Sequence, residues 1–176
     1  MNSEDKKKLL RSGAIVIIAL LAGYLLGIGS DLLVGKVAVS GKRSDDSGQR
    51  LIGTKLVLEG VDWSKSQRTL VFALQAGCHF CSASGDFYHR LVEQRSRFGN
   101  TRLVAVLPQT LDDSRLYLNK IGFAADEIRQ SPLSALGVRG TPTLFLVNAN
   151  GIITDTWTGK LSSARENNVI GELQTK

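Results

Sequence analysis

The chain contains few residues of the kinds that cross-link small proteins or bind metals. Its 176 residues include only two cysteines, Cys78 and Cys81, and two histidines, His79 and His89. Two cysteines are too few for a disulfide-stapled mini-protein, and a chain of this length does not need such staples. They are also only half of a structural zinc site, and His79 lies between them, where it can hardly bind the same ion. We therefore expect no metal, and the absence of a haem, quinone or flavin motif predicts no bound cofactor.

Aromatic residues and concentrated positive charge are also scarce. Aromatic residues make up 6% of the chain, and the net charge of +6 arises from 22 basic and 16 acidic residues that are interleaved along the sequence. A nucleic-acid-binding surface usually combines a basic stripe with stacking aromatic residues, and this sequence has neither. The sequence also lacks internal repeats and low-complexity tracts. The composition is that of an ordinary globular domain with an appendage.

One long hydrophobic run lies near the N-terminus. Residues 13–30 are almost purely apolar. At about 1.5 Å of rise per residue, a helix of this length covers about 27 Å, which is close to the hydrocarbon thickness of a bilayer. We predict a transmembrane signal anchor over residues 12–35. A cleaved signal sequence with a small-residue site at residues 38–40 is the alternative, but the apolar core is long for one.

Basic residues set the expected orientation of this anchor. Lys6, Lys7, Lys8 and Arg11 precede it, which predicts that residues 1–11 form a cytoplasmic tail. The protein is then a single-pass protein of the inner or plasma membrane. Its remaining part lies in the periplasm or another extracytoplasmic space.

The sequence after the predicted anchor changes character twice. Residues 36–54 are rich in Gly, Ser and charged residues, which indicates a linker, and residues 55–176 form the predicted folded domain. Within the anchor, Ala19, Gly23 and Gly27 recur every four residues. Small residues at this spacing allow two membrane helices to approach closely, which suggests a weak dimer.

Both cysteines belong to a Cys-x-x-Cys motif at the junction of a strand and a helix. Residues 69–74 have the pattern of a buried strand, and the spacing of Phe87, Leu91 and Phe98 predicts a helix that begins at the motif and runs to about Phe98. A thiol at such a junction faces unpaired N–H groups and the positive end of the helix dipole, which favour the thiolate. A two-residue gap closes too small a loop for an effective staple. The motif therefore predicts a redox-active dithiol.

Apolar patterning and turn residues predict the other elements. Asn148–Gly151 joins two strand patterns, which indicates a β-hairpin. The other expected elements are an edge strand at Lys55–Leu58, a buried strand at 102–107, a helix that starts with a capping box at Thr110–Asp113 and ends at Gly122, a short helix from Ser131–Pro132 to Leu136, and a last helix from about Ser162 to Leu173. This order predicts an α/β domain with a central mixed sheet flanked by helices.

The order of elements resembles the thioredoxin fold over roughly residues 55–173. The resemblance rests on the Cys-x-x-Cys position and on the sequence Gly140-Thr141-Pro142-Thr143 just before the hairpin. It implies a cis peptide bond before Pro142, which lies against the dithiol. It also implies thiol–disulfide exchange on protein substrates, with Cys78 as the nucleophile and Cys81 as the resolving thiol. The substrate-binding residues are then His79, Phe80, Thr141 and Pro142.

The predicted membrane anchor indicates a more specific group within the thioredoxin-like proteins. Membrane-tethered oxidoreductases of the TlpA/ResA type, which serve cytochrome c maturation and related tasks, are similar in organisation. Three positions depart from the expected pattern: Gly77 stands where thioredoxins usually have Trp, Phe72 where they have a buried Asp, and Ser84 where TlpA/ResA-like proteins often have Glu. Both positions that normally supply a proton-relaying carboxylate therefore lack one, and Asp86 is the nearest substitute.

Three functions stay open on this evidence. The first is thiol–disulfide exchange with cysteine-containing proteins, in which a membrane or soluble redox partner resets the dithiol. The second is a thiol peroxidase of the redoxin branch, although residues 74–77 lack the Pro and the Thr or Ser that this branch carries before its cysteine. The third is a binding module with a structural disulfide. The direction of electron flow is not fixed, because tethered relatives are often reductants, whereas His79 inside the motif suits an oxidant.

Overall fold

The structure is a computed structural model that describes residues 50–174. The predicted anchor, its small-residue face and most of the predicted linker lie outside the described residues. Between residues 50 and 174, no helix is both long enough and apolar enough to cross a membrane.

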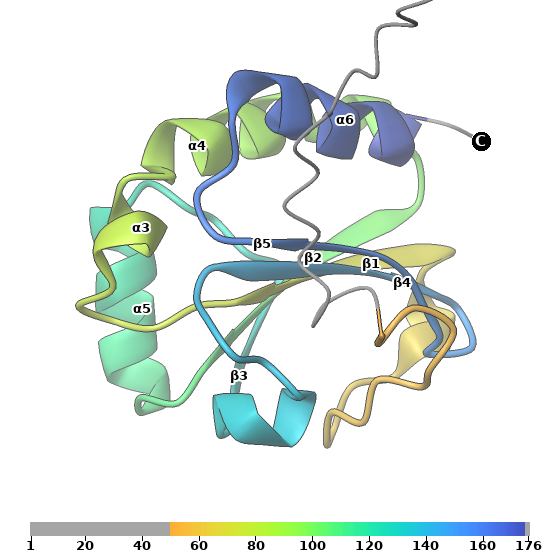
Figure 1. The fold of residues 1–176 in the computed structure, drawn as a ribbon, viewed down its shortest axis with the longest axis horizontal. Coiled ribbons are helices and arrows are strands. Elements are labelled where there is room, and N and C mark those ends of the chain that lie inside the picture. Colours follow the sequence, from red (N-terminus) through yellow and green to blue (C-terminus); the bar gives the residue numbers. More distant parts are fainter. Residues whose placement is uncertain (1–49, 175–176) are drawn as a thin grey trace, which may run out of the picture. The chain divides into compact units, whose positions relative to one another are not determined.

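A five-stranded sheet with the order β3-β2-β1-β4-β5 forms the centre of the domain (Figure 1). Its strands are β1 (Arg68–Ala73), β2 (Thr101–Leu107), β3 (Glu127–Gln130), β4 (Thr143–Asn148) and β5 (Ile153–Thr158). β1 runs parallel to β2, and β2 runs parallel to β3. β4 is antiparallel to both β1 and β5. The predicted mixed sheet, its parallel crossover and its C-terminal hairpin are confirmed.

Helices cover the two faces of the sheet unequally. The α-helices are α3 (His79–Ser82), α4 (Gly85–Glu93), α5 (Leu111–Lys120) and α6 (Ser163–Gln174), and the 3₁₀-helices are η1 (Trp63–Lys65), η2 (Arg95–Arg97) and η3 (Leu133–Leu136). α4 and α6 lie over one face, whereas η3 and the segment from residue 50 to η1 lie on the other (Figure 1). α3 and α5 lie side by side, where the Ser82 and Tyr117 hydroxyls are 3.3 Å apart.

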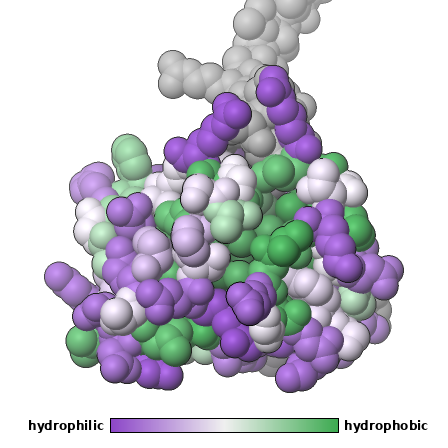
Figure 2. Space-filling model, turned by 90° about the horizontal axis from the view of Figure 1, so that it is seen from below, coloured by the Kyte–Doolittle hydropathy of each residue, from purple (hydrophilic) through white to green (hydrophobic). Residues whose placement is uncertain are grey.

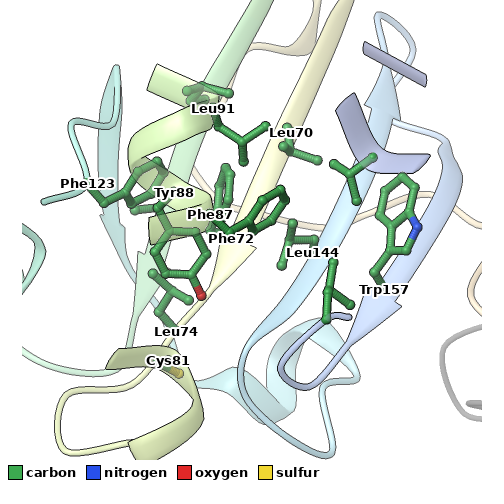
Figure 3. Packing of buried hydrophobic residues seen from close by; sticks show 14 of the residues in the cluster. Leu70, Phe72, Leu74, Cys81, Phe87, Tyr88, Leu91, Phe123, Leu144 and Trp157 are labelled. Atoms are coloured by element: carbon green, nitrogen blue, oxygen red, sulfur yellow. The ribbon is translucent and has the colours of Figure 1, made fainter. Parts of the chain in front are cut away.

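The alternation of side chains along β1 builds a separate apolar core on each face. Leu70, Phe72 and Leu74 point into the core beneath α4 and α6, and Val71 and Ala73 point into the other core. Phe72 is fully buried, and its ring packs edge-on against Tyr88 with the ring centroids 5.7 Å apart (Figure 3). The position that holds an Asp in thioredoxins is therefore filled by an aromatic core residue here.

The second face is closed by irregular chain instead of a long helix. Apolar side chains gather in the middle of this face with hydrophilic ones around them (Figure 2). Partly buried residues that pack there include Val61, Trp63 and Leu133. Gly151 has φ +80°, and a Cβ at this position would lie 2.8 Å from Cδ1 of Trp63, so only glycine allows the indole to lie on the hairpin turn.

Two short predictions were wrong in detail. Lys55–Leu58 is not a strand, because only an isolated bridge joins Lys55 to Ile152. The alternation there arises because Leu56 and Leu58 are buried on the second face while Val57 is 77% exposed. The short helix predicted after Ser131 is η3, with Pro132 as its N-cap residue instead of its first helical residue.

The helix predicted from the motif to about Phe98 is also wrong, because the chain breaks into α3, α4 and η2. At the first break, the Ser84 hydroxyl donates a hydrogen bond to the carbonyl of Phe80 (2.8 Å). Such back-bonding to residue i−4 often bends helices. Gly85 then begins α4 so close to the end of α5 that an added Cβ would lie 3.1 Å from the Ile121 carbonyl oxygen.

Candidate active site

Cys78 lies at the turn from β1 into α3 and acts as the N-cap residue of this helix. The backbone N–H of Cys81 donates to Cys78 Sγ at 3.1 Å, and Cys78 Sγ lies 3.4 Å from the carbonyl oxygen of Thr141, to which the thiol donates. Both thiols are free; Cys78 is partly exposed and Cys81 is fully buried. Gly77 precedes the pair with φ +82°, a conformation that a Trp at this position would rarely adopt.

The loop before β4 completes the site from a distant part of the chain. The Thr141–Pro142 peptide bond is cis, as the resemblance implied. The Thr143 hydroxyl donates to the carbonyl of Gly140 (2.7 Å), and the N–H of Gly159 donates to the carbonyl of Pro142 (2.7 Å). These bonds hold the loop against the end of β5 and aim the Thr141 carbonyl at Cys78.

The structure places the predicted substrate-binding residues on two sides of Cys78. Thr141 and Pro142 lie on the cis-proline loop, and His79 and Phe80 lie on α3. Both α3 residues are exposed, and the Phe80 side chain, 55% exposed, makes an edge-on contact with the His79 ring. The helix α4 carries His89 on its exposed side, where its ring faces Glu93 at 3.2 Å.

The protein shifts the pKa values of the two thiols in opposite directions. Burial opposes ionisation of Cys78, but hydrogen bonds from the Cys81 side chain, the Thr141 side chain and the backbone N–H groups of Cys81 and Phe80 outweigh it, so the pKa of Cys78 falls below the ordinary 9.0. For Cys81, burial is the main cause that raises the pKa to about 12, and the neighbouring Cys78 adds to it. The outer thiol is therefore the more acidic one.

The cause of the low Cys78 pKa differs from the sequence expectation. We expected the dipole of a long helix to favour the thiolate, but α3 has only four residues. The macrodipole of so short a helix is small, and the local hydrogen bonds to the sulfur stabilise the thiolate instead.

Between residues 50 and 174, the buried side chains that share the core with Cys81 include hydroxyl groups, and no Asp or Glu is buried. Asp86, the predicted substitute, is exposed on α4. Tyr88 of α4 and Tyr117 of α5 belong to the same buried cluster as Cys81, and Ser84 is buried beside them. Neither tyrosine was predicted from the sequence as a site residue. The sequence did contain a signal for Tyr88, since Cys81, Ser84 and Tyr88 follow one another at intervals of three and four residues, the spacing of neighbours on one helix face.

The acidity difference predicts how the reduced protein reacts with iodoacetamide. Because the thiolate is the reactive form, alkylation of Cys78 will reach half its maximal rate at a pH below 9.0, while Cys81 stays largely unreacted until the pH approaches about 12. Peptide mapping by mass spectrometry follows both thiols in one sample. A short Gly-Cys-His-Phe peptide serves as the unperturbed control, and equal midpoints for Cys78 and this peptide contradict the assignment.

Together, the sheet order, the dithiol after β1 and the facing cis-proline loop define a thioredoxin-like α/β fold. Within residues 50–174, no group of three or more His, Cys, Asp or Glu side chains is placed to hold a metal ion.

Solved structures with the same fold are similar to this chain. One is a thiol:disulfide interchange protein from Bacteroides sp., with 15% identity and a TM-score of 0.52 over 65% of this chain and 78% of the other. StoA from Bacillus subtilis has 17% identity and a TM-score of 0.51 over 63% and 84% of the two chains. The thioredoxin domain of a thiol-disulfide oxidoreductase from Bacteroides vulgatus has 16% identity and a TM-score of 0.51 over 69% and 91%. At this identity the likeness establishes the fold. No protein-family model and no curated protein matches the sequence.

Proposed function

We propose that this protein is a thiol–disulfide oxidoreductase that acts on cysteine-containing proteins through Cys78 and Cys81. The observation that carries the proposal is the arrangement of the two sulfurs. An acidified, partly exposed thiol faces the cis-proline loop, and a fully buried thiol of high pKa lies one helical turn behind it. Two proteins of similar structure, a thiol:disulfide interchange protein and a thiol-disulfide oxidoreductase, support the same chemistry.

In the reductive direction, the exchange takes two steps. The Cys78 thiolate attacks one sulfur of a substrate disulfide, a mixed disulfide forms, and the other substrate sulfur leaves as a thiolate. Cys81 then loses its proton and attacks Cys78 Sγ, which releases the second substrate thiolate and forms the Cys78–Cys81 disulfide. The protein is oxidised by two electrons and the substrate disulfide is reduced by two. In the oxidative direction the same steps run in reverse.

The surface around Cys78 suits an extended polypeptide. Phe80 offers an exposed apolar ring on one side of the thiol, and Thr141 is partly exposed on the other. In our proposal, backbone groups of the cis-proline loop pair with the substrate chain as an added strand would. His79 is the exposed first residue of α3, directly after Cys78, so its side chain is available to a substrate that binds at this thiol.

We also propose that the domain acts outside the cytoplasm on a membrane tether. The support for this part is the sequence of residues 12–35, with the basic residues that precede it. A redox partner, soluble or in the membrane, then resets the dithiol. The reduction potential of the Cys78–Cys81 pair decides the direction: about −270 mV is typical of the reductant thioredoxin, and about −120 mV of the oxidant DsbA.

The test is to trap the mixed disulfide. We expect that Cys81→Ser, incubated with a peptide that contains one disulfide, accumulates a covalent adduct at Cys78, because the resolving thiol is gone. Non-reducing gels and mass spectrometry detect the adduct, and dithiothreitol should release it. The wild-type protein, as control, should turn over the peptide and hold little adduct.

Absence of any adduct in Cys81→Ser, combined with an ordinary pKa of Cys78, contradicts the exchange mechanism. That result fits a binding module in which the two cysteines form a structural disulfide. Turnover of hydrogen peroxide faster than the peptide disulfide fits the redoxin alternative.

A further inference from the structure

The second step of the proposed exchange requires deprotonation of Cys81. This thiol must lose its proton before it attacks, yet it is fully buried. The two positions where related patterns carry a relaying carboxylate hold Phe72 and Ser84. Asp86 is exposed on α4. A proton acceptor for Cys81 must therefore come from other side chains that face it.

Tyr88 presents a buried hydroxyl that has no hydrogen-bond partner. Its ring is fully buried, and its oxygen points along the core toward the end where Cys81 lies (Figure 3). Ser84 lies beside it, but the Ser84 hydroxyl donates its one proton to the carbonyl of Phe80 (2.8 Å) and so cannot also donate to the Tyr88 oxygen. A buried hydroxyl without a partner is unfavourable, and a Phe would fill the same space without this cost. Its presence is explained if a partner appears during the reaction, and the Cys81 thiolate is such a partner.

Tyr117 lies between the buried core that holds this thiol and the surface. It belongs to the same buried cluster as Cys81, and its hydroxyl lies 3.3 Å from the hydroxyl of Ser82. Tyr117 is 9% exposed, and Ser82 is an exposed residue of α3. Tyr117 and Ser82 therefore lead from the core that contains Cys81 to the surface.

We propose that Tyr117 and Ser82 form the proton path of Cys81, and that the Tyr88 hydroxyl donates a hydrogen bond to the Cys81 thiolate. This inference rests on the proposed exchange function. The three hydroxyl groups act in place of the single carboxylate that is missing.

A mixed disulfide between Cys78 and a substrate is resolved in two stages, proton loss from Cys81 and attack by its sulfur. The phenol oxygen of Tyr117 accepts the Cys81 proton as its own proton passes to Ser82, and the Ser82 proton passes to water or hydroxide. The Cys81 sulfur then attacks Cys78 Sγ, the Cys78–Cys81 bond forms, and the bond to the substrate breaks. The substrate sulfur leaves as a thiolate with the bonding electron pair. Tyr88 keeps its proton and only shares it with the thiolate.

The described residues that face Cys81 make its titration interpretable. The turn before its helix contributes Cys78 and the backbone of Gln75, and Tyr88 of α4 and Tyr117 of α5 share its buried cluster. The cis-proline loop contributes Thr141, which does not titrate. β1 contributes Phe72 and Leu74, which are apolar members of the same cluster.

The test separates formation of the mixed disulfide from its resolution. Reduced protein is mixed with excess glutathione disulfide, quenched with acid at intervals, and analysed by mass spectrometry. We expect Tyr117→Phe to resolve the mixed disulfide roughly tenfold more slowly at pH 7, so that the glutathione adduct accumulates, while its formation by Cys78 changes less than about twofold. Tyr88→Phe should slow resolution severalfold without lowering the thermal midpoint of unfolding.

The pH profile distinguishes proton transfer from a loss of packing. Hydroxide takes the Cys81 proton directly as the pH rises, so the gap between Tyr117→Phe and wild type should narrow from pH 7 to pH 10. A defect of packing gives a gap that stays constant. Thr156→Val is the matched control, because Thr156 also has a buried hydroxyl without a partner but lies on β5. This variant should leave both phases unchanged.

Wild-type resolution rates and an unchanged pH profile in both tyrosine variants overturn the proton path. If Tyr117→Phe does not fold, Ser82→Ala carries the same test, because it interrupts the path at an exposed residue. Failure of the wild-type protein to form any adduct has a different meaning, since it refutes the exchange function itself.

Discussion

Replacing Cys78 with Ser is expected to lower the rate of disulfide reduction or transfer by at least about 10³-fold. A serine hydroxyl stays protonated at neutral pH and is a poor nucleophile toward disulfides, so the first step of the exchange cannot begin. Insulin reduction with dithiothreitol as the electron source measures the loss.

Cys78→Ser should leave the structure of the site intact, for a reason visible in its geometry. Cys78 is the N-cap residue of α3 and accepts a hydrogen bond from the N–H of Cys81. Serine is one of the preferred N-cap residues and replaces the sulfur in this bond. We therefore expect Cys78→Ser to keep the thermal midpoint of the reduced wild-type protein. Residual activity above a tenth of the wild-type rate would mean that Cys81 or another group initiates the exchange.

Replacing Phe72 with Ala is expected to lower the free energy of unfolding by about 3–5 kcal/mol. Phe72 is fully buried at the centre of the core beneath α4 and α6, and its ring contacts both Tyr88 and Phe123, with centroid distances of 5.7 and 4.4 Å. The substitution removes these contacts and leaves a cavity. A domain of this size is typically stable by only about 5–15 kcal/mol, so the loss is a large fraction of the total. Chemical denaturation of the reduced protein measures it.

Leu116→Ala is the matched control for this core substitution. Leu116 is also a large apolar residue, but its side chain on α5 is 69% exposed. Its replacement should change the free energy of unfolding by less than about 0.5 kcal/mol. A similar loss in both variants would indicate that Phe72 does not occupy the core position described here.

The sequence predicted the parts of the fold that rest on strong periodic signals. The apolar run within β1, the capping box of α5 and the Asn/Gly turn between β4 and β5 each determine structure locally, and all three are present in the structure. The cis bond at Thr141–Pro142 was foreseen from its motif and its place before the hairpin.

The secondary-structure predictions failed where tertiary contacts override weak local signals. β3 was not predicted, because its four residues Glu127–Gln130 are mostly polar and pair only as an edge strand, where Arg102 bridges to Glu127 at 3.0 Å. The break at Ser84 depends on a side-chain hydrogen bond that helix periodicity does not reveal.

The sequence predicted the nucleophile of the candidate site and its cis-proline loop, but it did not predict the side chains around the buried thiol. Cys78, Cys81 and the cis-proline loop follow from a short motif and a resemblance. The two tyrosine hydroxyls near Cys81 come from α4 and α5, and their convergence depends on how these helices pack. A tyrosine on an apolar helix face looks the same in sequence whether its hydroxyl reaches solvent or a thiol.

The position of β1 in the sheet has a consequence for the order in which the protein is made. β1 pairs with β2, which follows soon after it, and with β4, which follows much later. Synthesis proceeds from the N-terminus, so the two thiols emerge from the ribosome well before the loop that faces them. Until β4 arrives, one side of β1 has no partner and the sulfurs lack the surroundings that set their acidity. The reactive dithiol is therefore assembled late, when nearly the whole domain has been synthesised.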